Sequence, residues 1–443
     1  MNVALCGWRE PPRTSGRFAS KRRRDSEGVP VGLWRENSGM SQEMKPRPAL
    51  LVLASTYPRW AGDPEPGFVH ELARRLTDRF HVTVLCPHAP GAAARETLDE
   101  VDVVRYRYAP QAWETLVNDG GIVTNLRRAR WKYLLVPGFL LGQAWHAWCL
   151  VRHLRVDVIH AHWLIPQGSI AALMQWLPGR KVPFLVTSHG ADLYALNARW
   201  LDRIKAYVAR RAAAVTVVSA AMRERMVALG VSSGKVAVHP MGVDLVERFT
   251  PSPNVARSNS GILFVGRLVE KKGLRHLLDA LPEVLRRAPD ATLTIAGFGP
   301  EELALKEQVR ALGLAESVRF LGAVSQEGLP DLYRRAALFV APFIQAQSGD
   351  EEGLGLVLVE AIGCGCPILA GKVPALAEVL GDGFEDMAVD PRNVAELAGR
   401  IVMVLADPIA AREQASQLRR AIGNRLDWDA VAERYARLLV ANG

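Results

Sequence analysis

The sequence predicts an α/β protein of two domains, each built on a parallel β-sheet flanked by helices. Short, continuous apolar runs alternate with longer segments of helical periodicity, which is typical of βαβ units whose strands are buried on both faces. Two such series flank a polar stretch rich in proline, serine and asparagine, residues 248–261, which we interpret as a linker. A chain of 443 residues is also too long for one ordinary domain.

We therefore expect a first domain at residues 47–247 and a second at 262–425. The amphipathic end of the chain, residues 426–443, is expected to form a helix that packs back toward the first domain. Residues 1–46 have no apolar periodicity and lack the apolar core of a secretory signal. We expect a disordered tail or a mis-assigned translation start, because further methionines precede the first strand.

Composition and charge exclude several classes of protein. Hydrophobic residues make up 49% and charged residues 23% of the chain, which indicates a soluble globular protein with sizeable cores. The net charge is +9, but Lys and Arg are spread along the sequence, which argues against a dedicated nucleic-acid-binding face. Five cysteines at irregular spacing predict reduced thiols in a cytoplasmic protein. Cys364 and Cys366 are expected to be packing residues, because no further zinc ligands follow them at a typical spacing.

The first series begins with a buried strand at residues 49–55, followed by a loop and a helix at 68–76. Further strands are expected where aliphatic and β-branched residues cluster, at residues 81–86, 101–108, 157–163, 183–192, 214–219 and 236–244. Helices are expected at 168–177 and in a segment that ends at Gly230.

The segment 126–154 combines a basic, aromatic start with an apolar helix. Its basic and aromatic residues are Arg127, Arg128, Arg130, Trp131, Lys132, Tyr133, Trp145 and Trp148. Prolines, glycines and polar residues interrupt its apolar part, which argues against a membrane-spanning helix. Two interpretations stay open: a core helix with a solvated charged start, which we favour, and a peripheral contact with an anionic membrane through residues 126–150.

Three histidines are expected near the carboxyl ends of strands, where parallel sheets bind their ligands. His160 and His162 lie two residues apart and so on one side of a strand, a spacing that suits metal binding. Because no third ligand is apparent, we favour a structural or cleft-lining pair. His189 follows the next strand and is expected at the edge of a binding site.

The second series repeats the strand and helix alternation. Strands are expected at residues 262–266, 291–296, 318–322 and 338–341. The Gly297-Phe-Gly299 turn after the second of them is weak evidence for dinucleotide binding, because the third glycine of that motif is absent.

The stretch from Ser348 to Ala370 has the clearest functional pattern. An acidic, glycine-broken loop runs into an apolar helix and then a short strand. Amides in the first turn of a helix lack intrahelical partners and carry partial positive charge, so they suit a pyrophosphate or sugar oxygens. The residues expected to present their backbone in this way are Gly353, Leu354, Gly355 and Leu356.

Two glutamates flank this helix start. Glu352 and Glu360 would lie about 12 Å apart if all residues between them were helical, which suits two polyhydroxylated parts of one long ligand. Taken alone, each is as well explained as an acidic residue near a helix dipole or as a solvated helix glutamate.

An ordered set of motifs resembles the family 4 retaining glycosyltransferases, also called glycosyl transferases group 1, of the GT-B superfamily. The carboxyl half carries Gly266-Arg-Leu-Val-Glu-Lys-Lys-Gly273, Ile295-Ala-Gly-Phe-Gly-Pro-Glu301, Glu352-Gly-Leu-Gly-Leu with Glu360-Ala, and Gly363-Cys-Gly-Cys-Pro367. The amino half carries Asp157-Val-Ile-His-Ala-His-Trp163 and His189-Gly-Ala-Asp192. The resemblance covers about residues 48–440.

The resemblance implies two Rossmann-like domains that face each other across a cleft. The carboxyl domain would hold a nucleoside-diphosphate sugar donor and the amino domain a saccharide or lipid-linked acceptor, with no metal and no other cofactor. A hexose would then be transferred in polysaccharide or glycolipid synthesis, by a cytoplasmic enzyme or one bound peripherally at the inner face of the cytoplasmic membrane.

The resemblance also assigns roles to single residues. Arg267 and Lys272 match the basic pair that contacts the donor diphosphate, and Glu360 matches the glutamate that binds the ribose. Glu352 matches the residue that holds the donor sugar, and His189 matches the catalytic histidine presented from the amino domain.

Two loops depart from the family pattern. Family members often carry adjacent glycines near the diphosphate, whereas this chain has only Gly67 in a comparable place, and paired glycines are also missing at residues 371–374. The diphosphate-binding role of Gly67 is therefore the least supported of these assignments.

Retaining transfer could use an enzyme nucleophile, but no carboxylate is clearly placed beneath the anomeric carbon. Our hypothesis is a front-face displacement, in which the leaving phosphate accepts the proton of the acceptor and cations and amides stabilise it. The alternatives are a GT-B sugar-nucleotide epimerase, a synthase acting on sugar phosphates, and a non-catalytic subunit that binds nucleotide-sugars in an assembly complex.

Overall fold

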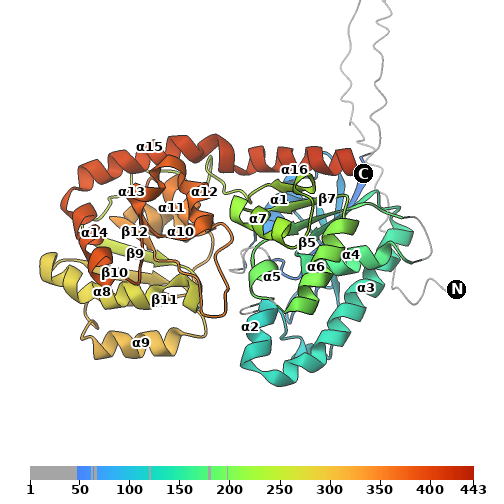
Figure 1. Ribbon diagram of the computed structural model, residues 1–443, viewed down its shortest axis with the longest axis horizontal. Helices are drawn as coiled ribbons and strands as arrows, with labels where there is room; N and C mark the ends of the chain where they lie inside the picture. The colour runs from blue at the N-terminus through green and yellow to red at the C-terminus, as the bar shows by residue number, and fades with distance from the viewer. Residues whose placement is uncertain (1–46, 61–62, 64–66, 119–120, 178–180, 197) are drawn as a thin grey trace, which may run out of the picture. The chain divides into compact units, whose positions relative to one another are not determined.

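A computed structural model describes residues 47–60, 63, 67–118, 121–177, 181–196 and 198–443 (Figure 1). The expected tail at 1–46 and residues 64–66 of the loop before the first helix lie outside the described residues. Within the described part, Pro48–Gly443 form one compact unit that contains two β-sheets.

The first sheet has the strand order β3-β4-β2-β1-β5-β6-β7-β8. Its strands are β1 (Ala49–Leu53), β2 (His81–Pro87), β3 (Arg95–Leu98), β4 (Val101–Tyr106), β5 (Val158–His162), β6 (Phe184–Ser188), β7 (Ala214–Val217) and β8 (Val236–Val238). All neighbours pair in parallel except β3, which runs antiparallel to β4 at the edge. The strands β5 and β6 are buried at every position, as inner strands of a parallel sheet are, and this includes the polar residues His160, His162, Thr187 and Ser188.

The second sheet is entirely parallel and has the order β11-β10-β9-β12-β13-β14. Its strands are β9 (Gly261–Val265), β10 (Thr292–Ala296), β11 (Val318–Gly322), β12 (Leu338–Ala341), β13 (Ile368–Gly371) and β14 (Ala388–Val389). The strand order reverses between β9 and β12, and open α/β sheets bind ligands beyond the carboxyl ends of their strands at such a switch point.

Helices cover both faces of each sheet (Figure 1). Around the first sheet they are α1 (Phe68–Arg75), α2 (Gly121–Arg128), α3 (Leu135–His153), α4 (Ser169–Met174), α5 (Ala191–Tyr194), α6 (Arg199–Arg211) and α7 (Ala220–Ala228). Around the second sheet they are α8 (Leu274–Arg287), α9 (Glu302–Ala311), α10 (Leu329–Arg335), α11 (Leu356–Gly363), α12 (Pro374–Leu380), α13 (Phe384–Met387), α14 (Val394–Ala406) and α15 (Pro408–Leu426). The last helix is α16 (Trp428–Asn442). The predicted α/β class with two parallel, Rossmann-like sheets is confirmed.

The strand β3 was not expected from the sequence. Its four residues, Arg95-Glu-Thr-Leu, alternate between exposed and half-buried positions at the sheet edge. A short polar edge strand has no apolar run that would identify it in the sequence. It is recognised as a strand by its pairing with the neighbouring β4.

The chain passes from one sheet to the other twice. Residues 239–260 form no helix or strand, and Arg257 in this segment donates to the carbonyl oxygens of Tyr333, Ala336 and Cys364. The segment expected to be a linker is therefore held against the second sheet at this point. The helix α15 packs on α11 and α12, whereas α16 packs on α1, β5 and β6.

The second crossing runs from α15 to α16, and a close backbone contact holds it to the first crossing segment. Val243 forms an isolated parallel bridge with Asp427, which caps α16 by accepting from the amide of Asp429. A Cβ on Gly242 would lie 2.7 Å from Cδ2 of Trp428, so glycine is needed for this approach. The indole of Trp428 is almost fully buried.

We expect Trp428→Ala to lower the free energy of unfolding by about 3–5 kcal/mol, because it leaves a large void where the two crossings meet. Thermal melting followed by circular dichroism measures this loss.

Trp200→Ala is the matched control, because Trp200 is 63% exposed, and its effect is expected within about 0.5 kcal/mol. Equal losses for the two variants would show that the contact with Gly242 carries no special weight.

Candidate functional site

A cavity of about 310 Å³ lies where the carboxyl ends of strands from both sheets come together. It is lined by eight of the residues that the sequence singled out: Gly67, His189, Lys272, Glu352, Leu354, Gly355, Leu356 and Glu360. Of the remaining two, Gly353 lies directly beside the cavity lining and Arg267 lies in the loop between β9 and α8. The structure therefore brings groups from both halves of the chain to one place.

Lys272 and Glu352 form an ion pair in this cavity. The Lys272 Nζ lies 2.7 Å from a Glu352 carboxylate oxygen, and the two side chains are only 13% and 15% exposed. The same Nζ lies 4.0 Å from the centre of the Phe343 ring. Burial alone would raise the pKa of Glu352, but the charges of Lys272 and Lys271 outweigh burial and lower it to about 2. Glu352 is thus ionised at neutral pH and accepts hydrogen bonds only.

Lys271 holds the neighbouring part of the acidic loop. Its Nζ lies 3.2 Å from the Asp350 carboxylate and donates to the Glu351 carbonyl oxygen at 3.0 Å. Two consecutive lysines after β9 therefore bind three consecutive acidic positions after β12. This contact fixes the loop that leads into α11.

The helix α11 starts later than the sequence suggested. Gly355 is its N-cap and has φ of +80°, a left-handed conformation that favours glycine, and regular helix begins at Leu356. The assumption that every residue from Glu352 to Glu360 is helical is therefore wrong, and the 12 Å estimate does not apply. The Gly355 amide donates to the Glu352 carboxylate, so it orients that side chain.

Glu360 is a buried carboxyl group at the inner end of the cavity. It is 7% exposed, and it accepts a hydrogen bond of 2.9 Å from the buried hydroxyl group of Tyr333. Burial raises the pKa of Glu360 to about 7, although the Tyr333 hydroxyl and the more distant Lys272 and Arg248 lower it in part. The interpretation of Glu360 as a solvated helix glutamate is wrong.

His189 reaches the cavity from the end of β6. Its Nε2 lies 2.9 Å from Nδ1 of His162, and its ring lies between Phe68 and Trp163 at centroid distances of 4.8 and 5.1 Å. Burial lowers the pKa of His189 to about 3, so the imidazole is neutral at pH 7. A Cβ on Gly353 would lie 2.5 Å from the His189 carbonyl oxygen. The main chain of the amino half thus contacts the main chain of the acidic loop.

Arg267 does not line the cavity, although it shares the loop of Lys272. It is half-buried between β9 and the 3₁₀ turn Glu270–Lys272. Gly67 lines the cavity as the N-cap of α1. The diphosphate-binding roles of Arg267 and Gly67 remain predictions.

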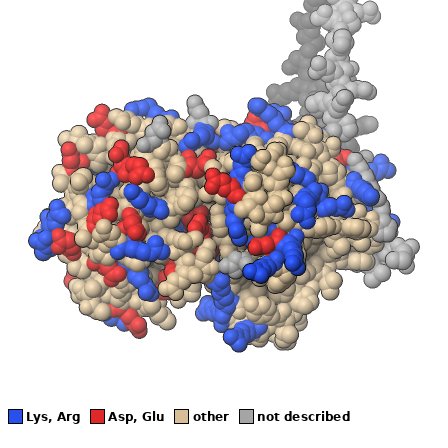
Figure 2. Space-filling view, in the orientation of Figure 1, with Lys and Arg blue, Asp and Glu red and all other residues tan. Residues whose placement is uncertain are grey.

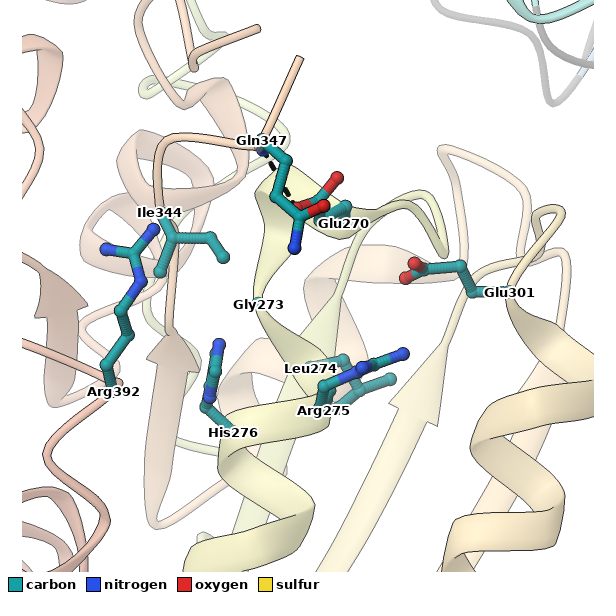
Figure 3. A pocket seen from close by; sticks show the side chains of 9 residues that line it. All are labelled: Glu270, Gly273, Leu274, Arg275, His276, Glu301, Ile344, Gln347 and Arg392. Carbon is teal, nitrogen blue, oxygen red and sulfur yellow. Dashed lines mark hydrogen bonds between the residues drawn. The ribbon is translucent and has the colours of Figure 1, made fainter. Parts of the chain in front are cut away.

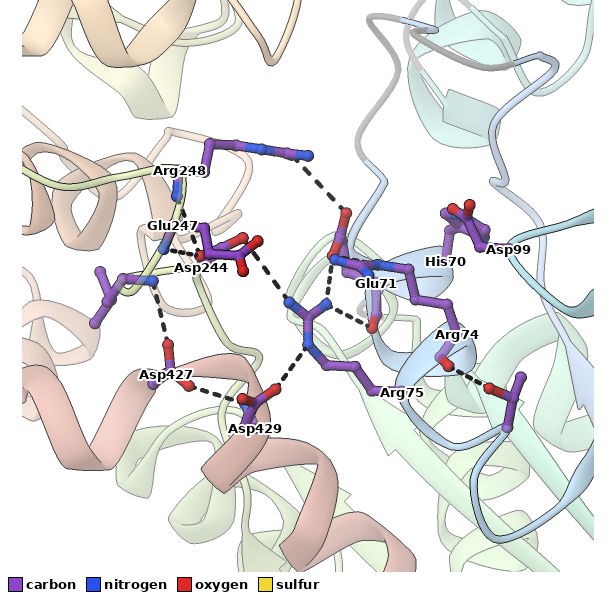
Figure 4. A network of polar contacts seen from close by, with 12 residues as sticks. His70, Glu71, Arg74, Arg75, Asp99, Asp244, Glu247, Arg248, Asp427 and Asp429 are labelled. Atoms are coloured by element: carbon purple, nitrogen blue, oxygen red, sulfur yellow. Dashed lines mark hydrogen bonds and ion pairs between the residues drawn. The ribbon is translucent and has the colours of Figure 1, made fainter.

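Sequence reasoning missed the polar residues at the back of the cavity. Glu71, Asp244 and Arg248 line it together with Trp428, and they belong to the network of charges in Figure 4. Arg75 joins this network to α16 through a contact of 3.2 Å with Asp429. These residues come from three segments far apart in the chain, and none lies in a recognisable motif, so no local signal identifies them.

A second cavity of about 380 Å³ opens near the start of α8 (Figure 3). It is lined by two arginines, Arg275 and Arg392, and by two glutamates, Glu270 and Glu301, beside His276, whose pKa is lowered by burial. None of the residues singled out from the sequence for a functional role lines it, so we assign the functional site to the first cavity.

The raised pKa of Glu360 predicts a pH-dependent gain in stability for Glu360→Gln. Between pH 4.5, the ordinary value, and pH 7 the folded protein retains a proton that the unfolded chain releases, so wild-type stability falls as pH rises through this window. The penalty above pH 7 is at most about 3.5 kcal/mol, at ~1.4 kcal/mol per pH unit. Thermal melts should show Glu360→Gln above wild type at pH 8 and equal to it at pH 4.

The exposed Glu413→Gln serves as the control and should leave both melting curves unchanged. A Glu360→Gln variant that gains nothing at pH 8 would contradict the burial argument.

Two family descriptions cover most of the chain: "Glycosyltransferase Family 4" matches residues 68–247 and "Glycosyl transferases group 1" matches residues 248–424. The glycogen synthase of Mycobacterium tuberculosis is 30% identical over 299 residues, 66% of this chain and 70% of that protein. The phosphatidyl-myo-inositol mannosyltransferase of the same species is 30% identical over 380 residues, 84% of this chain and 91% of that protein.

A solved structure has the same fold. Anabaena Alr3699/HepE in complex with UDP and glucose superposes with a TM-score of 0.67 at 20% identity, over 89% of this chain and all of that one. The motifs, the two facing sheets and these relatives agree, and the chain belongs to the family 4 glycosyltransferases of the GT-B superfamily.

Proposed function

We propose that this glycosyltransferase transfers a hexose from a nucleoside-diphosphate sugar to a saccharide or lipid-linked acceptor, with retention of anomeric configuration. The observation that carries the proposal is the ion pair of Lys272 and Glu352 in a cavity that Glu360 and His189 also line. A cation and three hydrogen-bonding groups at one cavity match the parts of such a donor: diphosphate, sugar and ribose.

The charge of each side chain suits the part of the donor that it is proposed to bind. Lys272 supplies positive charge to a departing diphosphate, so transfer is proposed to proceed without a metal. Arg267 lies on the same loop but does not line the cavity, so its contact with the diphosphate is a separate proposal. Glu352 stays ionised and accepts hydrogen bonds from sugar hydroxyls. Glu360, with Tyr333 behind it, accepts hydrogen bonds from the ribose.

His189 acts as a neutral group. A neutral imidazole carries one N–H that donates a hydrogen bond and one bare nitrogen that accepts one. His189 is therefore proposed to orient a sugar hydroxyl by a hydrogen bond and not to act as a cation. Retention is proposed to follow from front-face attack, in which the leaving phosphate takes the acceptor proton. Glu352 is already bound to Lys272 and Gly355, which suits a binding role better than that of a nucleophile.

The acceptor side is proposed to lie at an anionic membrane surface. The segment Arg130–His153 is long and apolar enough to cross a membrane by composition, yet α3 packs on β2 and β4, and Gln143 within it donates to the Ala54 carbonyl oxygen. The helix therefore packs on the first sheet along one side, but only 33% of its most apolar stretch is buried, so much of its surface is available for a bilayer.

Exposed residues in and near this segment are of the kinds that a membrane interface attracts. Leu134, Leu141 and Tyr133 are 81%, 71% and 58% exposed, and Trp113, Trp131 and Trp145 are also exposed. Arg127, Arg128 and Arg130 are exposed beside them, whereas Lys132 binds the Thr115 carbonyl oxygen and Asn125 within the fold. Figure 2 shows basic side chains gathered at the lower end of this half of the molecule.

We expect Lys272→Met and Glu352→Gln to reduce transfer at least about 100-fold, because each removes a charge from the cavity. Each variant is also expected to melt below wild type, since it leaves the other charge mostly buried without its partner. Wild type should gain thermal stability from its nucleotide-sugar donor, and Lys272→Met should gain little.

The double variant Lys272→Met/Glu352→Gln should regain stability without activity, and Lys306→Met, in an exposed pair with Glu302, should change neither. Proton NMR of the product should show the anomeric configuration of the donor. Inversion would contradict retention, donor binding without turnover would favour a non-catalytic subunit, and a product formed without acceptor would favour an epimerase.

We expect the purified protein to bind anionic vesicles of phosphatidylglycerol and phosphatidylcholine at low salt. Arg127→Glu/Arg128→Glu should weaken sedimentation with these vesicles at least tenfold, because each Lys or Arg near such a surface contributes about 1 kcal/mol.

The control Arg310→Glu/Arg319→Glu makes the same change of charge at exposed sites of the second half and should bind as wild type. Equal loss in both variants would mean that net charge, and not this surface, drives binding.

A further inference from the structure

His162 contacts His189, the proposed catalytic histidine. It ends β5 and pairs in register with Thr187 of β6, two residues before His189. Its Nδ1 lies 2.9 Å from His189 Nε2, and the two ring planes differ by only 5°, which suits an N–H···N hydrogen bond. His162 is 1% exposed and does not line the cavity, so it cannot meet a ligand directly.

A single proton joins the two rings. Burial keeps the pKa of both histidines far below the usual range, so each neutral ring has one N–H and one bare nitrogen. If His162 Nδ1 donates, His189 must hold its own proton on Nδ1. If His162 Nδ1 is bare, His189 donates from Nε2 and its Nδ1 is bare. The His162 tautomer thus decides whether His189 Nδ1 donates or accepts.

The other histidine of β5 has its own partners. The His160 ring lies 4.2 Å from that of His162, but its Nε2 contacts Thr187 Oγ1 at 2.7 Å. Thr187 Oγ1 contacts Thr216 Oγ1 at 2.6 Å, and the ring of Tyr435 on α16 packs on His160. The two histidines of β5 thus have separate partners, one in the core and one in the site.

We propose that His162 is a positioning residue for His189: by binding Nε2 it fixes the ring and sets whether Nδ1 meets the donor sugar as a hydrogen-bond donor or acceptor. The inference rests on the proposed function of His189. It assigns a role to His162, one of the two histidines that the sequence favoured as a structural or cleft-lining pair over a metal site.

The test compares three buried substitutions. His162→Leu removes the contact, His162→Asn places an amide where Nδ1 lies, and His160→Gln changes the neighbouring ring without touching His189. His162→Leu is expected to lower kcat about tenfold or more with a smaller change in donor KM, and His162→Asn to recover most of the loss. His160→Gln should stay within about twofold of wild type.

Nitrogen-15 NMR of histidine-labelled protein gives a readout that does not depend on activity. His189 should show one tautomer in wild type and a mixture in His162→Leu. A mixture already present in wild type would overturn the proposal even if the variants do not fold, as would an equal loss of kcat in His160→Gln. If His189→Ala retains full transfer, the proposed function fails while the NMR result still reports the coupling.

Discussion

The ion pair between Lys272 and Glu352 is the interaction on which the site depends. Each charge lies in a mostly enclosed position that it would not occupy alone, because a buried charge without a partner is strongly unfavourable. Together they bring the loop after β9 against the loop after β12, across the switch point of the second sheet. Lys271 reinforces the same contact through Asp350. Ion pairs within the protein therefore hold these two walls of the cavity in place.

The rest of the structure brings the amino half to this pair. Trp428 and Gly242 close the crossing between the sheets, and Arg75 ties α1 to the start of α16 through Asp429. These contacts lie at the back of the same cavity, so stability and site geometry depend on shared residues. A mutation of these residues can therefore lower activity by weakening the fold as well as by changing the cavity.

Most of the fold could be predicted from the sequence because buried parallel strands have continuous apolar runs. The polar edge strand β3 and the two-residue strand β14 were not predicted, because neither has an apolar run of strand length and only pairing with β4 and β13 makes them strands. The motif residues Lys272, Glu352, Glu360 and His189 could be found because their order along the chain is distinctive.

Other features of the site could not be predicted, because they exist only in three dimensions. The contribution of Arg248 depends on an approach to Glu71 of 3.8 Å between segments far apart in sequence. The burial of Glu360 could not be anticipated either, since its hydrogen-bond partner Tyr333 comes from a different helix. The spacing of Glu352 and Glu360 was misjudged because a left-handed glycine delays the start of α11.

The contact between His189 and Gly353 has a consequence for how the family fold can vary. His189 and Glu352 line one cavity at a point where any residue other than glycine at position 353 would place a carbon 2.5 Å from the His189 carbonyl oxygen. The approach of the two halves at this point is thus limited by main chain on both sides and not by side chains that could rearrange. A larger residue at position 353 would push the main chain of the two halves apart.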